Sequence, residues 1–160
     1  MMNVSPALKI YLASPLGFSP ENDSYRNKIK QHLIQHGHEI FDPWSQEEAA
    51  RRIKNALEIE DQKERKHAIS LAATFTGAAN ADGIRWADVV LAVLDGAELD
   101  SGTAAELGYG AGIGKKCIGL RTDFRDSGDL PGLPFNLQVL HFINQSGGTV
   151  FRKIEDICLS

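Results

Sequence analysis

The sequence ADVVLAVLD, residues 87–95, and the sequence DSGTAAELGYGAG, residues 100–112, together decide the fold. The first stretch is a continuous apolar run of strand length, which is typical of a strand buried on both faces. The second is rich in small residues and indicates a helix that begins near Ser101 or Gly102. A buried strand that leads into a helix predicts one unit of a parallel α/β sheet, where ligands bind beyond the carboxyl ends of the strands.

The segments around this unit continue the alternation of strand and helix. The patterns predict strands at residues 8–13, 38–41, 88–94 and 116–120, and helices at residues 21–35, 46–58, 59–73, 78–86 and 149–158. Ser45 and Glu48 fit a capping box at the start of the second helix. Residues 74–77 are a candidate interruption of the long helical segment, and residues 137–143 fit either a short strand or a turn of helix.

This alternation predicts βαβ units with right-handed crossovers. We expect an α/β fold of the flavodoxin-like type, a doubly wound parallel sheet of four to five strands with helices on both faces. The chain has 160 residues, which suits a single domain over residues 1–160. Residues 1–7 are expected to form a loose tail.

Composition restricts the partners and the compartment. The net charge of −4 argues against a nucleic-acid partner and against an anionic membrane surface. The two cysteines, Cys117 and Cys158, have neither metal-ligand spacing nor the pattern of a disulfide framework, which predicts a reducing, cytoplasmic location. We expect no signal peptide, no membrane span and no metal site.

Two carboxylates, Asp100 and Glu106, are the candidates for chemistry. The neighbours of Glu106 are small and apolar, unlike those of a solvated face, and Tyr11 should lie at the same edge of the sheet, where a phenol can orient a carboxylate. A carboxylate so placed can act as the nucleophile of glycosyl transfer. Asp100 is suited to bind a hydroxyl, although an N-cap role is the common use of aspartate before a helix.

The alternating glycines at residues 108–114 do not form a nucleotide-binding motif. A dinucleotide fingerprint would place its glycines before the helix and after the first strand, and no phosphate-binding loop is present. Gly108 and Gly112 are four residues apart on one helical face, so we expect them to provide close packing of the helix on the sheet.

Four segments resemble a known family when they are taken in order. They are IYLASPLG at residues 10–17, NADGI at 80–84, DSGTAAELGY at 100–109 and GLPFNL at 132–137. The chain resembles the nucleoside 2-deoxyribosyltransferases, in the broader superfamily that includes the 2'-deoxynucleoside 5'-phosphate N-hydrolases. The resemblance covers nearly the whole chain.

The resemblance implies a role for each matching residue. Glu106 matches the nucleophile that attacks C1' of a 2'-deoxynucleoside and releases the base, after which a second, free nucleobase takes the deoxyribosyl group. Tyr11 matches the tyrosine that orients this glutamate, and Asp100 matches the aspartate that binds the sugar hydroxyls. Asn136 matches an asparagine that reaches the 5'-hydroxyl from a neighbouring subunit, which implies a homo-oligomer. No metal or organic cofactor is implied.

Other residues of the matching segments complete the candidate site. Gly17, Ser101 and Gly102 belong to the same segments and are further substrate-binding candidates. Phe18 follows the first segment directly, and its ring is suited to stack on a base.

Asn80 departs from the family pattern. The family often has an aspartate eight residues before the strand's own Asp88, where it handles the proton on the base. An amide cannot exchange a proton in this way, although it can hydrogen-bond the edge of a base. Asp82 is not expected to substitute, because on a helix it points about 200° away from Asn80.

The substrate is expected to be a free nucleoside. The phosphate-using branch typically carries serine at the position of Asp100, where a carboxylate would repel a phosphate dianion. It also usually carries an arginine in the first loop, and residues 14–20 contain none. Two alternatives stay open: an N-glycoside hydrolase of 2'-deoxynucleosides or their 5'-monophosphates that also uses Glu106, and a non-catalytic nucleoside-binding protein.

Overall fold

A five-stranded parallel sheet forms the centre of the structure, a computed structural model that describes residues 6–159. Residues 1–5, which include most of the expected tail, and residue 160 lie outside the described residues. The strands are β1 (Lys9–Ala13), β2 (Glu39–Phe41), β3 (Val89–Val93), β4 (Lys116–Leu120) and β5 (Val150–Phe151). Their order is β2-β1-β3-β4-β5, with every neighbouring pair parallel. This is the strand order of the flavodoxin-like fold, as expected.

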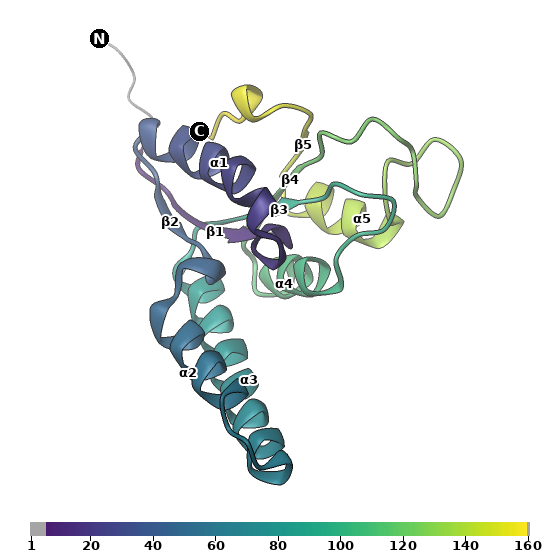
Figure 1. The fold of residues 1–160 in the computed structure, drawn as a ribbon. Helices are drawn as coiled ribbons and strands as arrows, with labels where there is room; N and C mark the ends of the chain where they lie inside the picture. The colour runs from purple at the N-terminus through teal and green to yellow at the C-terminus, as the bar shows by residue number, and fades with distance from the viewer. Residues whose placement is uncertain (1–5, 160) are drawn as a thin grey trace.

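Helices cover both faces of the sheet (Figure 1). The α-helices are α1 (Asp23–Gln35), α2 (Glu47–Leu57), α3 (Gln62–Trp86), α4 (Ser101–Gly112) and α5 (Leu137–Gln145). Short 3-10 turns are η1 (Leu16–Phe18), η2 (Pro20–Asn22), η3 (Pro43–Ser45) and η4 (Ile154–Asp156). Along residues 6–159, no helix combines the length and the apolar character that crossing a membrane would require.

Alternate residues of each strand supply two separate cores. On one face, Leu12 and Leu91 pack with Ile29 and Leu33 of α1. On the other face, the strands pack against α3, α4 and α5 through a second set of buried side chains: Tyr11, Ala13, Ile84, Val90, Ala92, Leu107, Val139 and Ile143. Because a parallel sheet is buried on both faces, the long apolar run at residues 87–95 is explained.

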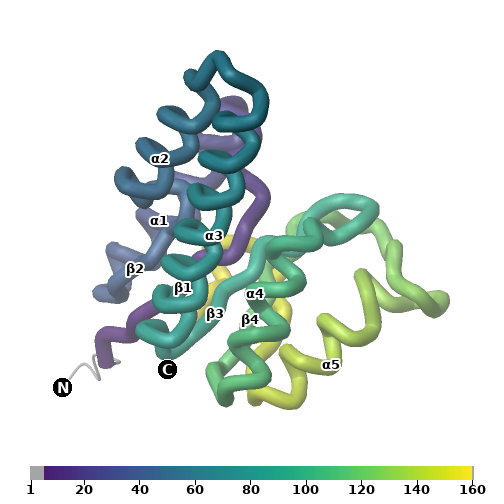
Figure 2. The backbone as a smooth tube through the Cα atoms, turned by 90° about the horizontal axis from the view of Figure 1, so that it is seen from below, coloured from purple at the N-terminus to yellow at the C-terminus, as the bar shows by residue number. Residues whose placement is uncertain are grey.

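Helices α2 and α3 form an antiparallel pair that projects from the body of the protein as an arm (Figures 1 and 2). Helix α3 is continuous over 25 residues, so the interruption considered at residues 74–77 is absent. Thr74 and Thr76 fit inside the helix because their hydroxyls donate to the carbonyls of Ser70 and Ala72, each four residues earlier.

The capping box expected at Ser45 does not form. Ser45 ends the 3-10 turn η3, and its hydroxyl donates to the buried carboxylate of Asp42. Helix α2 begins after Gln46, which makes no side-chain capping bond. Asp42 takes the capping role one turn earlier, where its side chain accepts from the backbone N–H of Trp44.

The C-terminal segment also differs from the expectation of a helix at residues 149–158. Val150 and Phe151 instead add a short edge strand to β4, and Ile154 begins the 3-10 turn η4. Ile154 and Ile157 are buried on the α1 face of the sheet, which accounts for their helix-like spacing. Of the two alternatives for residues 137–143, the helix is correct, and it extends from Leu137 to Gln145 as α5.

Candidate active site

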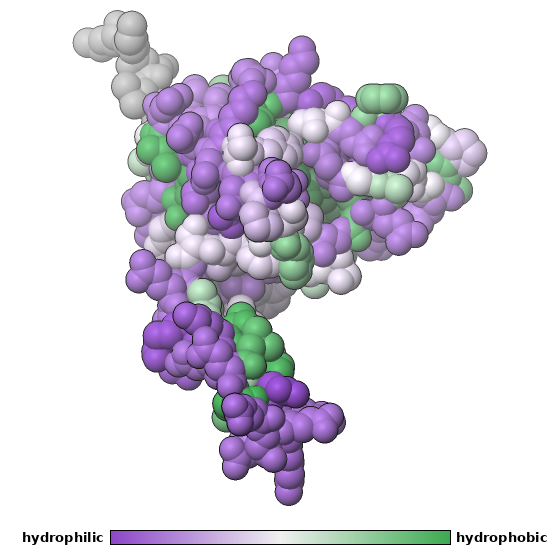
Figure 3. All heavy atoms as spheres, in the orientation of Figure 1, coloured by the Kyte–Doolittle hydropathy of each residue, from purple (hydrophilic) through white to green (hydrophobic). Residues whose placement is uncertain are grey.

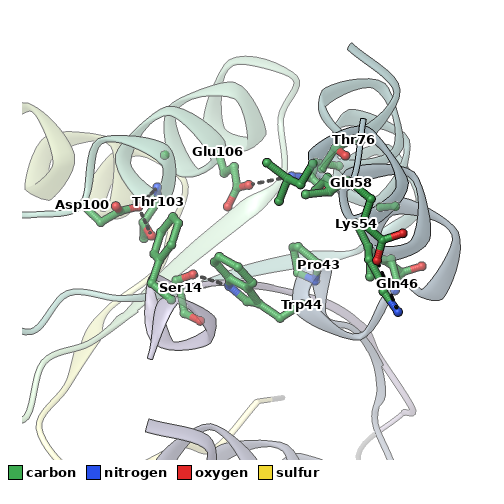
Figure 4. Close-up of a pocket in the computed structure, with 17 residues that line it drawn as sticks. Ser14, Pro43, Trp44, Gln46, Lys54, Glu58, Thr76, Asp100, Thr103 and Glu106 are labelled. Atoms are coloured by element: carbon green, nitrogen blue, oxygen red, sulfur yellow. Dashed lines mark hydrogen bonds and ion pairs between the residues drawn. The ribbon is translucent and has the colours of Figure 1, made fainter. Parts of the chain in front are cut away.

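A cavity of about 850 Å³ opens at the carboxyl ends of β1 and β3, beside the arm (Figure 4). These two strands are neighbours in the sheet, but the helices that follow them, α1 and α4, lie on opposite faces. In this class of sheet, ligands bind where the chain changes faces in this way. The cavity is lined by Ser14, Phe18, Pro43, Trp44, Gln46, Ala49, Ala50, Ile53, Lys54, Leu57, Glu58, Thr76, Asn80, Asp100, Gly102, Thr103 and Glu106. It therefore brings together five of the residues that were predicted from sequence to form the site: Phe18, Asn80, Asp100, Gly102 and Glu106.

Glu106 lies on the second turn of α4, with its carboxylate in the cavity (Figure 4). Burial raises the pKa of Glu106, and the negative charge of Asp100 raises it further. The neighbouring donors of Tyr11 and Asn80 act in the opposite direction and lower this pKa. The balance is a poorly solvated carboxyl group whose pKa lies above its usual value. Such a group is suited to nucleophilic attack.

Asn80 provides the one hydrogen bond to this carboxylate that residues 6–159 contain. Its Nδ2 atom donates to Oε1 of Glu106 over 3.3 Å. Asn80 lies on α3, so the bond joins the arm to the helix that carries the candidate nucleophile. Asp82 is exposed and pairs with Arg85 on the outside of α3, which agrees with the expectation that it points away from the site.

Tyr11 is fully buried at the middle of β1, stacked on Phe41 with ring centroids 5.4 Å apart. Its hydroxyl makes no hydrogen bond with acceptable geometry to any residue from 6 to 159. Burial raises the pKa of Tyr11 far above its usual value, and the negative charge of Glu106 raises it further. Tyr11 is thus a neighbour of the carboxylate, with a donor still available.

Asp100 is the N-cap of α4. Its Oδ2 atom accepts from the backbone N–H of Thr103 at 2.8 Å and from the Thr103 hydroxyl at 2.9 Å. A Cβ at Gly102 would lie 3.2 Å from Oδ2 of Asp100, a tight contact that a small shift of the carboxylate would relieve. The capping role and a substrate-binding role are compatible, since Asp100 also lines the cavity. Ser101, the first residue of α4, is exposed and does not line it.

Aromatic residues form the wall of the cavity that faces Glu106. Trp44 donates its indole N–H to the carbonyl of Ser14 at 2.8 Å, and Phe18 packs edge-on against its ring with centroids 4.6 Å apart. Phe18 is 74% exposed, which leaves its ring free to meet a ligand. Gly17 does not line the cavity; it allows Trp44 to lie against the backbone, because a Cβ at Gly17 would be 2.0 Å from the indole.

Asn136 lies away from this cavity. It is the N-cap of α5, where its Oδ1 accepts from the backbone N–H groups of Gln138 and Val139 and its Nδ2 donates to Asp129. It lines a second cavity of about 530 Å³ between α4, α5 and the loops before them. Within one chain, Asn136 and Glu106 are therefore not part of the same cavity.

The expectation that Gly108 and Gly112 provide close packing of α4 on the sheet is wrong. A Cβ at Gly112 would meet nothing within 4 Å, and one at Gly108 would make only ordinary contact with Phe142. The glycine that allows α4 to approach the sheet is Gly110, where a Cβ would lie 2.7 Å from Val90. Gly110 is also one of the buried residues of α4.

A buried arginine, Arg121, joins the two loops that lead to Asp100 and to Asn136. It follows β4 and is fully buried. Its guanidinium donates to the carbonyls of Leu94 and Gly96 on one side and to the carbonyl of Arg125 on the other. Sequence reasoning missed this residue, because an arginine at the end of an apolar strand gives no signal of burial.

Sequence reasoning also missed the contribution of the arm. Gln46 and Thr76 line the cavity, together with a row of small and apolar residues on α2. The signal available in the sequence was the spacing of Ala49, Ile53 and Leu57 on one helical face. Among residues 6–159, no group of three or more histidine, cysteine or acidic side chains is arranged to hold a metal ion.

Comparisons with known proteins agree with the geometry. The family model described as nucleoside 2-deoxyribosyltransferase matches residues 10–138. No curated protein matches the chain. Among solved structures, a 2-deoxyribosyltransferase from Bacillus psychrosaccharolyticus is 27% identical, with a TM-score of 0.59 over 94% of this chain and 92% of that chain. A 2-desoxiribosyltransferase from Leishmania mexicana is 26% identical, with a TM-score of 0.58 over 94% and 93% of the two chains.

The fold extends to a more distant relative. The CMP N-glycosidase BcmB of Clostridium botulinum has a TM-score of 0.53 over 92% of this chain and 93% of that chain, at 13% identity. At that identity, only the fold is shared. The family match, by contrast, covers β1 with Tyr11, α3 with Asn80 and α4 with Glu106. The chain therefore belongs to the nucleoside 2-deoxyribosyltransferase family.

Proposed function

We propose that the protein transfers 2'-deoxyribose from one nucleobase to another through a covalent bond to Glu106. The observation that carries this proposal is the placement of the Glu106 carboxylate. It is partly buried in a cavity at the carboxyl ends of β1 and β3, and a neutral amide holds one of its oxygens. A carboxylate in such surroundings has few competing solvent contacts, which leaves its oxygens free to attack, as a nucleophile requires.

The reaction proceeds in two balanced steps. An oxygen of Glu106 forms a bond to C1' as the bond from C1' to the base nitrogen breaks, and the base takes that electron pair together with a proton from solvent water. A nitrogen of the incoming base then forms a bond to C1' and loses its proton to solvent water, which balances the first step, and the electron pair of the ester bond returns to Glu106. Each step passes through an oxocarbenium-like state, which the missing 2'-hydroxyl makes easier to reach.

Asn80 orients the nucleophile in this proposal. Its amide is bonded to Oε1 of Glu106, so Oε2 is the oxygen directed to C1'. The Tyr11 hydroxyl, which is buried beside Glu106 and has no bond of its own within residues 6–159, adds a second donor when the carboxylate shifts onto the sugar. Asn80 can also present its carbonyl oxygen to a base edge.

Asp100 and Asn136 bind the sugar. The Oδ2 atom of Asp100 caps α4, so its Oδ1 atom is available to a sugar hydroxyl. Asn136 does not line the cavity that contains Glu106, and we propose that it serves the site of a neighbouring subunit in a homo-oligomer. The negative charges of Asp100 and Glu106 favour a free nucleoside over a phosphorylated one.

Product analysis tests the proposal. The protein is incubated with deoxyinosine, with and without free adenine, and the products are separated by chromatography. We expect deoxyadenosine and hypoxanthine only when adenine is present. Release of free deoxyribose at a rate independent of adenine would replace transfer with hydrolysis. Binding of deoxyinosine with no turnover would indicate a nucleoside-binding protein.

The nucleophile is tested separately. Replacing Glu106 with alanine removes the covalent route, and we expect the transfer rate to fall by about 10⁴-fold or more. A mass increase of one deoxyribosyl group on the intact wild-type protein, and its absence in the variant, identifies the intermediate. Full activity in the Glu106→Ala variant would remove Glu106 from the mechanism.

A further inference from the structure

A buried carboxylate, Asp42, takes no part in the proposed reaction. It follows β2 directly, its side chain is 3% exposed, and it does not line the cavity that contains Glu106. Burying a charged carboxylate costs free energy unless hydrogen bonds and opposite charges compensate for the lost water. The partners of Asp42 therefore indicate what this residue does in the fold.

Two cations of α1 supply the opposite charge. Oδ2 of Asp42 lies 3.1 Å from Nζ of Lys30 and 3.7 Å from Nε of Arg26. The outer side of α1 is largely hydrophilic (Figure 3), but the side chains of Lys30 and Arg26 are only 23% and 13% exposed. Within the part of the chain that the structure describes, Lys30 pairs with no other carboxylate. Charge therefore ties Asp42 to α1.

The other bonds of Asp42 lead to the turn η3 and the residue after it. Oδ1 accepts from the backbone N–H of Trp44 at 3.0 Å, and Oδ2 accepts from the hydroxyl of Ser45 at 2.9 Å. The backbone carbonyl of Asp42 accepts from Nε2 of Gln46 at 3.1 Å. Bonds to an ionised carboxylate are stronger than bonds between neutral groups. One residue thus holds three consecutive residues in place.

Two of these three residues line the cavity. Trp44 lies across it from Glu106, and Gln46 lies beside the start of α2 (Figure 4). Gln46 uses one amide hydrogen on Asp42, which leaves its Oε1 atom and its second N–H for a ligand. A flat aromatic ring next to a hydrogen-bond donor and an acceptor suits a planar ligand with polar edges, such as a nucleobase.

We propose that Asp42 is a positioning residue for the nucleobase, and that Lys30 holds its carboxylate in the orientation this role requires. Asp42 acts through Trp44 and Gln46, which we call the base wall. The proposal rests on the proposed function in one respect, that the ligand of the base wall is a nucleobase. The leaving base and the incoming base occupy the cavity in turn, so the same wall serves both. Asp42 therefore sets the affinity for the base.

Replacing Asp42 with asparagine separates this role from simple packing. Asparagine has nearly the same shape, and its carbonyl oxygen can still accept from the backbone N–H of Trp44. Its amide N–H₂ group then faces the ammonium group of Lys30, so two donors meet and the cation loses its carboxylate. We expect η3 to move away from Lys30 and to carry the base wall with it.

Tryptophan fluorescence reports on the base wall without turnover. The chain has two tryptophans, so Trp86→Phe leaves Trp44 as the single reporter. In this background we expect free adenine or free thymine to quench the emission of Trp44, and the titration gives the dissociation constant. Adding Asp42→Asn should shift the emission and raise that constant by about 10-fold, as when a hydrogen-bonding partner is moved out of place.

Tyr25→Phe is the matched control for the loss of a bond from α1. It removes the 3.0 Å bond from the Tyr25 hydroxyl to Asp95, which is also partly buried, and leaves Asp42 untouched. We expect this variant to have a lower Tm with the emission of Trp44 and the affinity for the base unchanged. A merely structural role for Asp42 predicts the same result for Asp42→Asn.

Lys30→Met tests the ion pair, and it tests the proposal alone if circular dichroism shows that Asp42→Asn is unfolded. We expect it to weaken base binding by less than Asp42→Asn does, because Arg26 and Ser45 still contact the carboxylate. The double variant no longer contains an unpaired ammonium group. It should bind the base no more weakly than Asp42→Asn alone, which is the non-additivity of two residues in contact.

The proposal is overturned if neither base quenches Trp44 in the Trp86→Phe protein. It is also overturned by a folded Asp42→Asn variant, or a Lys30→Met variant, that keeps the emission and the affinity of the parent. Failure of the proposed function is a separate result. A protein that binds adenine and forms no deoxyadenosine disproves transfer, and the effect of Asp42→Asn on adenine binding still decides the role of Asp42.

Discussion

The side-chain amide of Asn80 donates a 3.3 Å hydrogen bond to Oε1 of Glu106, and this bond joins the arm to the candidate nucleophile. The position was expected to face the base, where an asparagine cannot replace the proton chemistry of an aspartate. In the structure its first contact is the carboxylate. An amide there can hold a carboxylate without adding charge.

The bond predicts a change in pH dependence when Asn80 is replaced with alanine. The amide lowers the pKa of Glu106, so its loss raises that pKa further. Because the nucleophile must be ionised, the acid limb of the kcat/KM profile should move to higher pH. We also expect kcat to fall by about 10- to 100-fold, since the carboxylate loses its orientation.

A neighbouring residue serves as the control for Asn80. Asp82 lies two residues along α3 and points outward to Arg85. The Asp82→Asn variant should retain both the rate and the acid limb of the wild-type protein. An acid limb that stays in place in Asn80→Ala would show that the amide does not influence the ionisation of Glu106.

Glu106 should lower the stability of the fold at neutral pH. Burial raises the pKa of Glu106 in the folded state above its value in the unfolded chain. The penalty for ionising it is absent below the unfolded pKa and is complete once the pH has risen above the folded pKa. We therefore expect Glu106→Gln to raise the Tm at pH 7, and this gain to shrink as the pH falls into the acid range. Thermal melts of both proteins from neutral to acid pH measure this difference, and a gain that is constant with pH would contradict it.

Asp100 should discriminate against phosphorylated substrates. Replacing Asp100 with serine removes a negative charge from the cavity and retains an N-cap for α4, because serine is among the preferred capping residues. We expect the variant to bind a 2'-deoxynucleoside 5'-monophosphate more tightly than the wild-type protein does. Binding of the free nucleoside should weaken in the same variant. Isothermal titration with both ligands measures the exchange, and an unchanged ratio of affinities would remove Asp100 from substrate selection.

Two glycines of α4 provide a matched pair for stability. The Gly110→Ala variant places a methyl group 2.7 Å from Val90 and should destabilise the fold by about 1–3 kcal/mol. The Gly112→Ala variant meets nothing within 4 Å, and we expect a change between zero and a gain of about 1 kcal/mol. Urea unfolding measures both. Equal changes in the free energy of unfolding for the two variants would mean that α4 does not pack closely on β3 at Gly110.

The sheet could be predicted from the sequence because parallel strands are buried on both faces and read as apolar runs. Residues 87–95 located β3, and the small residues after them located α4 with Asp100 and Glu106. The alternation of strand and helix predicted the parallel pairing and the flavodoxin-like type of sheet. The roles of Glu106 and Asp100 were inferred from their apolar setting and from the family resemblance, which the comparisons confirm at the level of the family.

The errors arose where a local pattern was overridden by a contact distant in sequence. The hydroxyl of Ser45 bonds to Asp42, so the predicted capping box had no free capping group. Val150 pairs with Gly119 of β4, and this edge pairing replaces the helix that the spacing of residues 149–158 suggested. The contact between Asn80 and Glu106 spans 26 positions and two helices, and no pattern within either helix predicts it.

Arg121 gives the framework of the site an anchor that does not depend on pH. An arginine stays protonated throughout the range in which proteins function, and its partners here are backbone carbonyls and the Ser127 hydroxyl, which do not titrate in that range. The loops that lead to Asp100 and Asn136 therefore keep their anchor while Glu106 gains or loses its proton. A change in the protonation of Glu106 is therefore not expected to release the Arg121 anchor.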